Sequence, residues 1–277
     1  MTWCCLNGEI MPIEHAAISP MDRGFLFGDG VYEVMVQIDG HIRANSLHEA
    51  RLQSSLDAIG LSVSAADVFA DVVRLSKKTG LLNAKIYVQV TRGASPVRDH
   101  AFPSQISPTV FLTISEFEAI IRKPVKAIVC PDIRWRCNSI KSVSLLGNVL
   151  LLQEARESGA QEAILYRDDL VTEASTSNVF LIRGQSLITP PLSDLILPGI
   201  TRHLVIEIAP TVGLDVVEEA IRVDSLPSAD GLFVSSSTRG LMPIVELDPG
   251  GQVGNGQLTE AFVALQAAYD ERLHYHE

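Results

Sequence analysis

Residues 132–141 read DIRWRCNSIK and lead directly into residues 142–152, SVSLLGNVLLL. The first run is extended and partly apolar and the second is the apolar start of a helix, so Lys141 is expected at a strand-to-helix junction. Loss of hydration there, and the like charges of Arg134 and Arg136 upstream, both favour a neutral lysine amine. A neutral amine is the nucleophile with which lysine forms Schiff bases. The alternative, a lysine that extends its ammonium group from a half-buried position into water, is the commoner case for a single lysine.

The composition is that of a globular protein, since 47% of the 277 residues are apolar and 20% are charged. This length is sufficient for two lobes. The formal net charge of −11 argues against a general surface for nucleic acids or anionic membranes, both of which need clustered positive charge. Arginines outnumber lysines 16 to 6, however. A local anion site therefore remains compatible with the net charge, because arginine binds carboxylate and phosphate groups as a planar fork.

The sequence carries no pattern typical of a secreted, membrane or metal-binding protein. The four cysteines show neither zinc-ligand spacing nor a Cys-x-x-Cys pair, which favours reduced thiols in a cytoplasmic protein. Residues 1–10 have no signal-peptide pattern, and no apolar run approaches the ~18 residues of a membrane span. We therefore expect a soluble, cytoplasmic protein without a metal site.

The first part of the chain alternates between predicted strands and helices. Residues 31–38 are predicted to form a strand that ends at the Asp39-Gly40 turn, with Ile42 opening the return. Ser46-Leu47-His48-Glu49 reads as a capping box at the start of a helix that runs to Gly60. A second helix is expected over 65–75, and strands over 85–91 and 109–115. Residues 116–124, closed by Pro124, form the best linker candidate.

The second part follows the same mixed pattern. Strands are predicted at 125–130, 132–136 and 231–236, a hairpin joins 163–166 to 170–182 around Asp168-Asp169, and helices are predicted at about 145–158, 201–209 and 259–273. Short strands interleaved with a few helices indicate an α+β fold. We expect two lobes, residues 1–118 and residues 119–277.

Three segments of the second part are candidates to bind an anion or a heterocycle. The run 197–201 (LPGIT) precedes a helix start, where free N–H groups can form a phosphate cup; an ordinary Pro-Gly turn is an equal alternative. The hydroxyl run 235–238 (SSST) offers further phosphate contacts, although a polar loop is the better reading of that run alone. Glu173 lies between apolar strands, where a carboxylate needs a cationic or proton-donating partner. A protonated pyridine nitrogen is such a partner, and a structural salt bridge is the alternative.

Together with Lys141, these segments supply the contacts that pyridoxal 5′-phosphate (PLP) requires. Their order and context resemble the class IV, or fold-type IV, PLP-dependent aminotransferases, and most closely the D-amino acid aminotransferases. The segments that carry this resemblance span most of the chain: 22–33 (DRGFLFGDGVYE), 48–52 (HEARL), 140–142 (IKS), 171–180 (VTEASTSNVF), 199–202 (GITR) and 235–238 (SSST).

The resemblance implies a small N-terminal α/β lobe and a larger C-terminal pseudo-barrel lobe that binds PLP. It also implies that Lys141 forms the Schiff base with the cofactor and then moves the proton, and that Glu173 pairs with the pyridine nitrogen. The remaining cofactor-binding residues that it implies are Arg51, Ser175, Leu197, Ile200, Thr201, Ser236 and Ser237. Arg51 has its own alternative, as an exposed arginine on a helix.

The substrate prediction depends on the Gly/Pro loop 91–103, in which Arg98 and His100 stand two residues apart. An arginine fork beside an imidazole suits an α-carboxylate. The resemblance implies that this pair reaches into the partner subunit's site of a homodimer, where the Tyr32 hydroxyl donates to the same carboxylate. Val97 makes the loop one residue longer than in some members of the family, and Ala174 stands where glycine is familiar.

The first-ranked function is the transamination of D-alanine and related D-amino acids with 2-oxoglutarate, giving 2-oxo acids and D-glutamate. A branched-chain L-aminotransferase or an aminodeoxychorismate lyase would share Lys141 and Glu173. The segment 31–34 (VYEV) argues against the first, for which a Tyr-x-Glu-Gly-type strand is expected, and Arg-x-His is not a hallmark of the second. A non-catalytic protein that binds PLP or another phosphometabolite would share the phosphate cups but needs no nucleophilic lysine.

Overall fold

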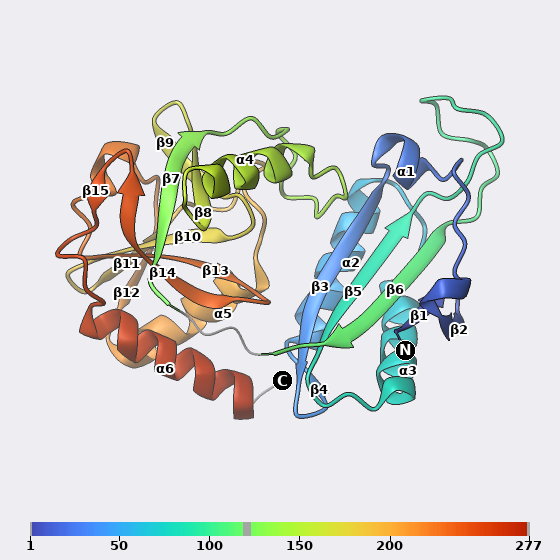
Figure 1. Cartoon of the computed structure of the whole chain (residues 1–277), viewed down its shortest axis with the longest axis horizontal. Coiled ribbons are helices and arrows are strands. Elements are labelled where there is room, and N and C mark those ends of the chain that lie inside the picture. The colour runs from blue at the N-terminus through green and yellow to red at the C-terminus, as the bar shows by residue number, and fades with distance from the viewer. Residues whose placement is uncertain (1, 119–122, 276–277) are drawn as a thin grey trace. The chain divides into compact units, whose positions relative to one another are not determined.

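The computed structural model describes residues 2–118 and 123–275, and the chain divides into two compact units (Figure 1). The first unit contains residues 2–118 together with residues 140–144. The second contains residues 123–139 and 145–275. Lys141 therefore belongs to the first unit, although its sequence neighbours on both sides belong to the second. Part of the predicted linker, residues 119–122, lies outside the described residues.

The first unit is built on a six-stranded antiparallel sheet. In spatial order its strands are β2 (Glu9–Pro12), β1 (Trp3–Leu6), β6 (Thr109–Glu116), β5 (Ala84–Thr91), β3 (Gly30–Ile38) and β4 (His41–Ile42). Helices α2 (Asn45–Ala58) and α3 (Ala65–Thr79) cover one face of the sheet (Figure 1). Their buried leucines and valines pack on Met35 and Ile86 in a single core. The short α1 (Arg23–Phe27) and the 3-10 turn η1 (Ile13–His15) precede β3.

The predicted strands and helices of this unit are confirmed to within a few residues, with one local error. The helix predicted from a capping box begins at Asn45, after Ala44 in a left-handed conformation, and no side chain caps it. Ser46 is thus inside α2 and not at its N-cap. By contrast, Ser64 does cap α3 through the backbone N–H of Asp67, and Gly80 ends that helix with a φ of 66°. Strands β1 and β2 and helix α1 were not predicted.

The second unit contains a nine-stranded mixed sheet that curls into a half-barrel. In spatial order its strands are β12 (Asp215–Glu218), β11 (Ser186–Thr189), β10 (Asn178–Arg183), β13 (Gly231–Ser236), β14 (Gly240–Asp248), β7 (Val125–Pro131), β8 (Glu162–Arg167) and β9 (Leu170–Ala174), with β15 (Gly251–Gln252) paired to β14. The predicted α+β fold, with a small antiparallel sheet and a large curled sheet, is confirmed.

Among its described residues, the second unit also contains the helices α4 (Leu146–Glu157), α5 (Ile200–Ile208) and α6 (Glu260–Tyr275), with 3-10 turns η2 (Ala209–Val212) and η3 (Val223–Ser225). Helices α5 and α6 pack on each other, and the core includes the stacked rings of Phe180 and Phe233, 4.9 Å apart, with Phe262 of α6 beside them. None of the described helices is long and apolar enough to span a membrane. All four cysteines are free thiols.

Two strand predictions in this unit are wrong. Residues 132–136 form no strand, because the Asp132 side chain accepts a hydrogen bond from the backbone N–H of Arg134 and turns the chain locally. The long strand predicted over 170–182 is two strands, β9 and β10, separated by residues 175–177. The Asp168-Asp169 turn between β8 and β9 is confirmed, with both aspartates at positive φ.

Candidate active site

Lys141 lies on the segment 140–144, which runs along β3 of the first unit. The Lys141 carbonyl accepts a hydrogen bond from the Tyr32 backbone N–H at 2.9 Å, and the Ser55 hydroxyl accepts one from the Lys141 N–H at 3.2 Å. The Lys141 Nζ stands 4.3 Å from the centroid of the Tyr32 ring. A cation over an aromatic face is attracted to it. Helix α4 starts only at Leu146, so the backbone of Lys141 is fixed by β3 and α2 and not by a strand-to-helix junction.

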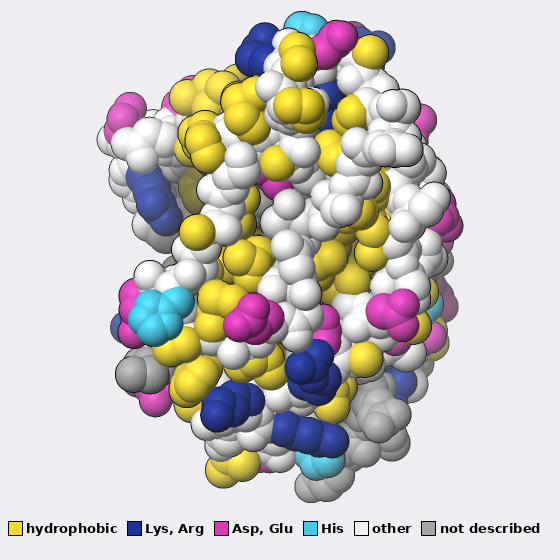
Figure 2. Space-filling view, turned by 90° about the vertical axis from the view of Figure 1, so that its right-hand side faces the viewer, with side chains coloured by type: hydrophobic (Ala, Val, Ile, Leu, Met, Phe, Trp, Pro, Cys, Tyr) yellow, Lys and Arg dark blue, Asp and Glu magenta, His cyan; other side chains and the backbone are white. Residues whose placement is uncertain are grey.

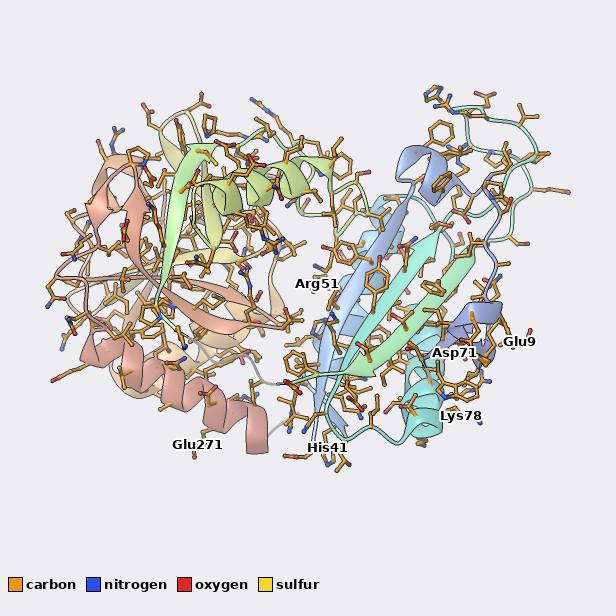
Figure 3. The ribbon with its side chains drawn as sticks, in the orientation of Figure 1. Glu9, His41, Arg51, Asp71, Lys78 and Glu271 are labelled. Atoms are coloured by element: carbon orange, nitrogen blue, oxygen red, sulfur yellow. The ribbon has the colours of Figure 1, made fainter. Side chains whose placement is uncertain are left out.

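Beside this segment is a buried charged group formed by Glu33, His48 and Arg51 (Arg51 is labelled in Figure 3). Arg51 donates from Nε and Nη2 to the two Glu33 oxygens at 2.7 and 2.8 Å, and the His48 Nδ1 lies 2.7 Å from Glu33 Oε2. Arg51 is buried on α2, so the alternative of an exposed helix arginine is excluded.

The protonation states of this group follow from burial and pairing. Burial alone would raise the pKa of the Glu33 carboxyl, but Arg51 and His48 lower it to about 2. Burial lowers the pKa of His48, and the charges of Arg51 and Lys141 act in the same direction against the pull of Glu33. Glu33 is therefore an anion and His48 a neutral donor at neutral pH, and the Arg51 guanidinium is held in one orientation.

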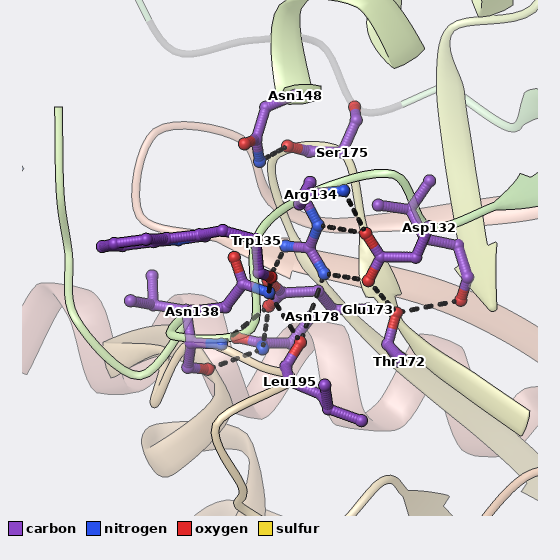
Figure 4. Close-up of polar contacts among 12 residues, drawn as sticks. Asp132, Arg134, Trp135, Asn138, Asn148, Thr172, Glu173, Ser175, Asn178 and Leu195 are labelled. Carbon is purple, nitrogen blue, oxygen red and sulfur yellow. Dashed lines mark hydrogen bonds and ion pairs between the residues drawn. The ribbon is translucent and has the colours of Figure 1, made fainter. Parts of the chain in front are cut away.

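Glu173 of β9 is the centre of a second buried group, in the second unit (Figure 4). Its Oε1 accepts from Arg134, and its Oε2 accepts from Asn178 Nδ2 at 3.2 Å and from the Leu197 backbone N–H at 2.9 Å. A carboxylate offers about four lone-pair directions. Three donors leave one of them for a further N–H. The predicted alternative, a structural salt bridge, is thus present, but it does not use the full accepting capacity of Glu173.

Arg134 is also bound by a second carboxylate. It donates from Nε and Nη2 to Asp132 at 2.9 and 2.8 Å, as a bidentate pair. Burial raises the pKa of the Glu173 carboxyl, and Arg134 opposes that rise only in part. Asp132 and the Glu173–Arg134 pairing were not predicted. The Asp-x-Arg spacing of residues 132 and 134 is a sequence signal for an ion pair. From the sequence, Arg134 is interpreted only as a like charge near Lys141.

The predicted phosphate cup at 197–201 coincides with the N-terminus of α5. The helix begins at Ile200 after Gly199, and no side chain caps it. The first N–H groups of a helix have no acceptor within it. A Cβ on Gly199 would come within 2.0 Å of Asn178 Oδ1, so glycine allows the chain to approach Asn178 and, through it, Glu173. Ile200 and Thr201 are both buried at this helix start.

The hydroxyls at the end of β13 lack partners. Ser235 pairs with Asn178 across the β10–β13 ladder, and the Oγ atoms of Ser235 and Ser236 are buried without a hydrogen bond from any described residue. A buried hydroxyl without a partner costs about 1–3 kcal/mol. Such groups are suited to a ligand that brings its own acceptors, as a phosphate does.

Ser175 belongs to a different cluster. Its hydroxyl donates to Glu162, and the hydroxyls of Thr176 and Ser177 lie within hydrogen-bond distance of the same carboxylate. Arg239, in the turn after β13, donates to Glu162 as well. Sequence reasoning missed Glu162 and Arg239. A structural partner thus holds the Ser175 side chain, and its assignment to the cofactor stays a prediction.

The structure brings Arg98 and His100 together on the ring of Phe27. The Arg98 guanidinium carbon lies 4.7 Å from the ring centroid, and the His100 ring lies 5.1 Å from it. Arg23 fixes the loop by donating to the carbonyls of Asp99 and His100 at 2.6 and 3.2 Å. Both side chains are exposed. At the top of the face in Figure 2, hydrophobic side chains gather beside basic and histidine side chains.

The predicted site residues thus fall into separate groups. Tyr32, Arg51 and Lys141 lie together in the first unit, where Arg98 and His100 form an exposed pair. Glu173 and the cup residues lie in the second unit. These groups supply an amine, a carboxylate that is incompletely neutralised, and a helix start with buried hydroxyls.

Comparisons with known proteins place these groups in context. The family model for amino-transferase class IV matches residues 30–247. A D-alanine aminotransferase of Staphylococcus epidermidis is 36% identical over 282 residues, covering 100% of this chain and 99% of that protein. One of Bacillus licheniformis is 38% identical over 259 residues, covering 90% and 89%. The solved structure of the branched-chain amino acid aminotransferase from Escherichia coli matches with a TM-score of 0.89 at 24% identity, covering 100% and 96%, and is similar in fold.

Proposed function

The chain belongs to the class IV aminotransferases, and from this premise we propose that it transfers the amino group of D-alanine and related D-amino acids to 2-oxoglutarate. The products are the 2-oxo acid, pyruvate from D-alanine, and D-glutamate. The family sets the reaction type. The observation that carries the substrate class is the exposed Arg98–His100 pair on Phe27, in a chain that is 36% and 38% identical to two D-alanine aminotransferases.

The proposed cofactor is PLP, whose ring supplies an electron sink for the carbanion that forms when the substrate loses its α-proton. Three features of the chain fit this group. Glu173 has room for one more N–H donor and lacks full neutralisation, which suits a protonated ring nitrogen. The start of α5 and the unpaired Ser236 hydroxyl suit a phosphate, with Ser237 beside them. In this proposal Arg51 would supply a fixed cation for the phosphate, and Leu197 would pack on the ring.

Lys141 is the proposed catalytic residue. With the cofactor bound, its amine would be the nucleophile toward the cofactor's carbonyl and would then carry the proton to and from the substrate Cα. Its backbone is fixed by Tyr32 and Ser55, so that rotation of the side chain alone moves the amine. His48 nearby is neutral, so it adds no positive charge beside the Lys141 amine.

Arg98 and His100 are proposed to bind the substrate α-carboxylate together with the Tyr32 hydroxyl. Arg23 holds the loop that carries the first two, so little order has to be gained on binding. In this proposal the protein is a cytoplasmic homodimer, and the Arg98–His100 pair serves the partner subunit's site.

The test is to incubate the purified protein with 2-oxoglutarate and either D-alanine or L-leucine, and to assay the 2-oxo acid product. The proposal predicts pyruvate from D-alanine and little product from L-leucine. Turnover of L-leucine alone would reject the D-specific function. Release of pyruvate and 4-aminobenzoate from aminodeoxychorismate, without transamination, would identify a lyase. Lys141→Ala separates the binding-protein alternative, because a non-catalytic binder needs no amine at this position and would bind PLP unchanged.

A further inference from the structure

Asp132 and Glu173 are two buried carboxylates that share one guanidinium. Arg134 donates two N–H groups to Asp132, from Nε and Nη2, and a single one, from Nη1, to Glu173 (Figure 4). Thr172 also donates its hydroxyl to Asp132 at 3.0 Å. Asp132 thus has the better geometry for the shared charge, because a bidentate pair is the stronger of the two arrangements.

A second cation, Arg167, also approaches Asp132. The Arg167 Nε is 3.3 Å from Asp132 Oδ2, while its Nη2 donates to the backbone carbonyls of Arg134 and Trp135. The charged groups of this cluster are therefore two carboxylates and two guanidiniums, and only one of the cations touches Glu173.

The two carboxyls respond unequally to the same arginine. The pKa of Asp132 is lowered, since Arg134 outweighs the effect of burial, whereas the pKa of Glu173 is raised because burial outweighs Arg134. Both directions agree with the hydrogen-bond geometry. Arg134 gives two of its N–H groups to Asp132 and one to Glu173, so its hydrogen bonds favour Asp132.

We propose that Asp132 and Arg134 are positioning residues for Glu173. Because Asp132 holds Arg134 in a bidentate pair, the negative charge of Glu173 is only partly neutralised. The site therefore selects a protonated ring nitrogen over a neutral ring. This inference rests on the proposed function, because it takes Glu173 as the partner of the cofactor's ring nitrogen. Arg134 fixes the carboxylate orientation, and Asp132 sets how far that carboxylate is neutralised.

The inference gives opposite signs for two substitutions. Asp132→Asn removes one negative charge, so that Arg134 and Arg167 together neutralise Glu173 and the preference for a cationic ring falls. Arg167→Gln removes one of the two positive charges at Asp132, so that Asp132 draws more on Arg134 and the preference rises. Asp132→Glu keeps the charge and retains the preference.

The experiment measures the binding of pyridoxine 5′-phosphate and of its 1-deaza analogue to the cofactor-free full-length protein by calorimetry. Neither ligand has an aldehyde, so Lys141 forms no bond with them, and they differ only at the ring atom that faces Glu173. The readout is the ratio of the two dissociation constants. We expect Asp132→Asn to lower the preference for the nitrogen-containing ring about tenfold, the equivalent of one pKa unit, and Arg167→Gln to raise it.

The matched control is Asp194→Asn, which removes the same charge from an exposed side chain that accepts the Ser139 hydroxyl at 2.7 Å. It should leave the ratio unchanged. A loss of fold would weaken both ligands equally, and if Asp132→Asn does not fold, Arg167→Gln decides. If the wild type discriminates between the two ligands but the ratio is unchanged in both Asp132→Asn and Arg167→Gln, the inference is overturned and the proposed function stands. A wild type that does not discriminate overturns the assignment of Glu173 in the proposed function, and the inference with it.

Discussion

Glu33 and Glu173 are both buried carboxylates that face an arginine, one in each unit, yet their pKa values shift in opposite directions. Burial raises both. At Glu33 two N–H groups of Arg51 and the His48 ring outweigh burial, whereas at Glu173 the single N–H of Arg134 does not. The difference lies in whether the guanidinium is divided, since Arg51 gives its bidentate face to Glu33 and Arg134 gives its own to Asp132.

The two carboxylates differ in role: Glu33 is a structural anchor that fixes Arg51, and Glu173 is a group available to bind a ligand. A carboxylate whose burial is fully compensated, such as Glu33, holds Arg51 in place, and its removal would leave the charge of Arg51 buried and unpaired. A carboxylate that is compensated in part gains most from a ligand that brings a positive charge. Each unit contains one tryptophan, Trp3 in the first and Trp135 in the second, so the two carboxylates can be tested separately by fluorescence.

The largest expected effect is that of Glu33→Gln on the stability of the first unit. Removal of this carboxylate leaves the Arg51 guanidinium buried without its ion pair, and loss of one partner of a buried pair costs roughly 3–5 kcal/mol. The measurement is urea unfolding of the cofactor-free protein in a Trp135→Phe background, where Trp3 alone reports. The control is Asp71→Asn, a half-buried carboxylate whose ion-pair partner Arg74 is largely exposed, so that its loss leaves no buried charge unpaired. A Glu33→Gln midpoint equal to that of the control would contradict the role of an anchor.

The second effect concerns pH. The folded pKa of Glu33, about 2, lies below its ordinary value of 4.5, so its contribution to the free energy of unfolding is present above pH 4.5 and is lost as the pH falls toward 2. The size of this contribution is about 3 kcal/mol. The contribution of Glu173 has the opposite pH dependence. Because its folded pKa is raised, its contribution to the free energy of unfolding is lost as the pH rises through the raised value.

This prediction is checked by the pH dependence of urea unfolding for the wild type, Glu33→Gln and Glu173→Gln. Glu33→Gln should flatten the acid slope below pH 4.5 for the first unit, and Glu173→Gln should leave that slope intact. An acid slope that survives in Glu33→Gln would assign it to other carboxylates.

The fold was largely predictable from sequence because its clearest elements carry strong local signals. The strand predicted at 85–91 and the helix predicted at 65–75 needed no tertiary information, and they are observed at 84–91 and 65–79. The failures have local causes. At 132–136 the apolar pattern indicated a strand, but the side chain of Asp132 bonds the backbone two residues on. At 175–177 the hydroxyls turn toward Glu162 and interrupt the strand.

The candidate site was predictable only in part, for a similar reason. Motif positions such as Lys141, Glu173 and Arg51 are recognised from their neighbours in sequence, and their roles remain predictions. Their charge partners lie far away along the chain, since Arg134 and Glu173 are 39 residues apart and Arg239 and Glu162 are 77 apart. No local pattern specifies such pairs. The sharing of Arg134 with Asp132, which sets Glu173 apart from Glu33, is visible only in the structure.

A smaller effect is expected where the backbone approaches Glu173. Gly199→Ala would place a Cβ 2.0 Å from Asn178 Oδ1 and push that amide away from Glu173, at a cost of about 1–3 kcal/mol for overpacking. The matched control is Gly231→Ala, whose Cβ would meet neighbours at 3.4–3.5 Å. Unfolding in a Trp3→Phe background, where Trp135 reports on the second unit, measures both. Equal midpoints would mean that Asn178 moves aside without loss.

The smallest effect on stability is predicted for Glu173→Gln, and it is the sharpest test of the contrast with Glu33. Arg134 keeps its bidentate pair with Asp132 in this variant, and a glutamine oxygen still accepts one hydrogen bond, so the loss should be at most about 1 kcal/mol. The measurement is the urea midpoint in the Trp3→Phe background. The same variant should lose the preference for pyridoxine 5′-phosphate over its 1-deaza analogue, because the negative charge is gone. A loss as large as that of Glu33→Gln would show that Glu173 is also an anchor, and the two buried carboxylates would then differ only in their surroundings and not in their roles.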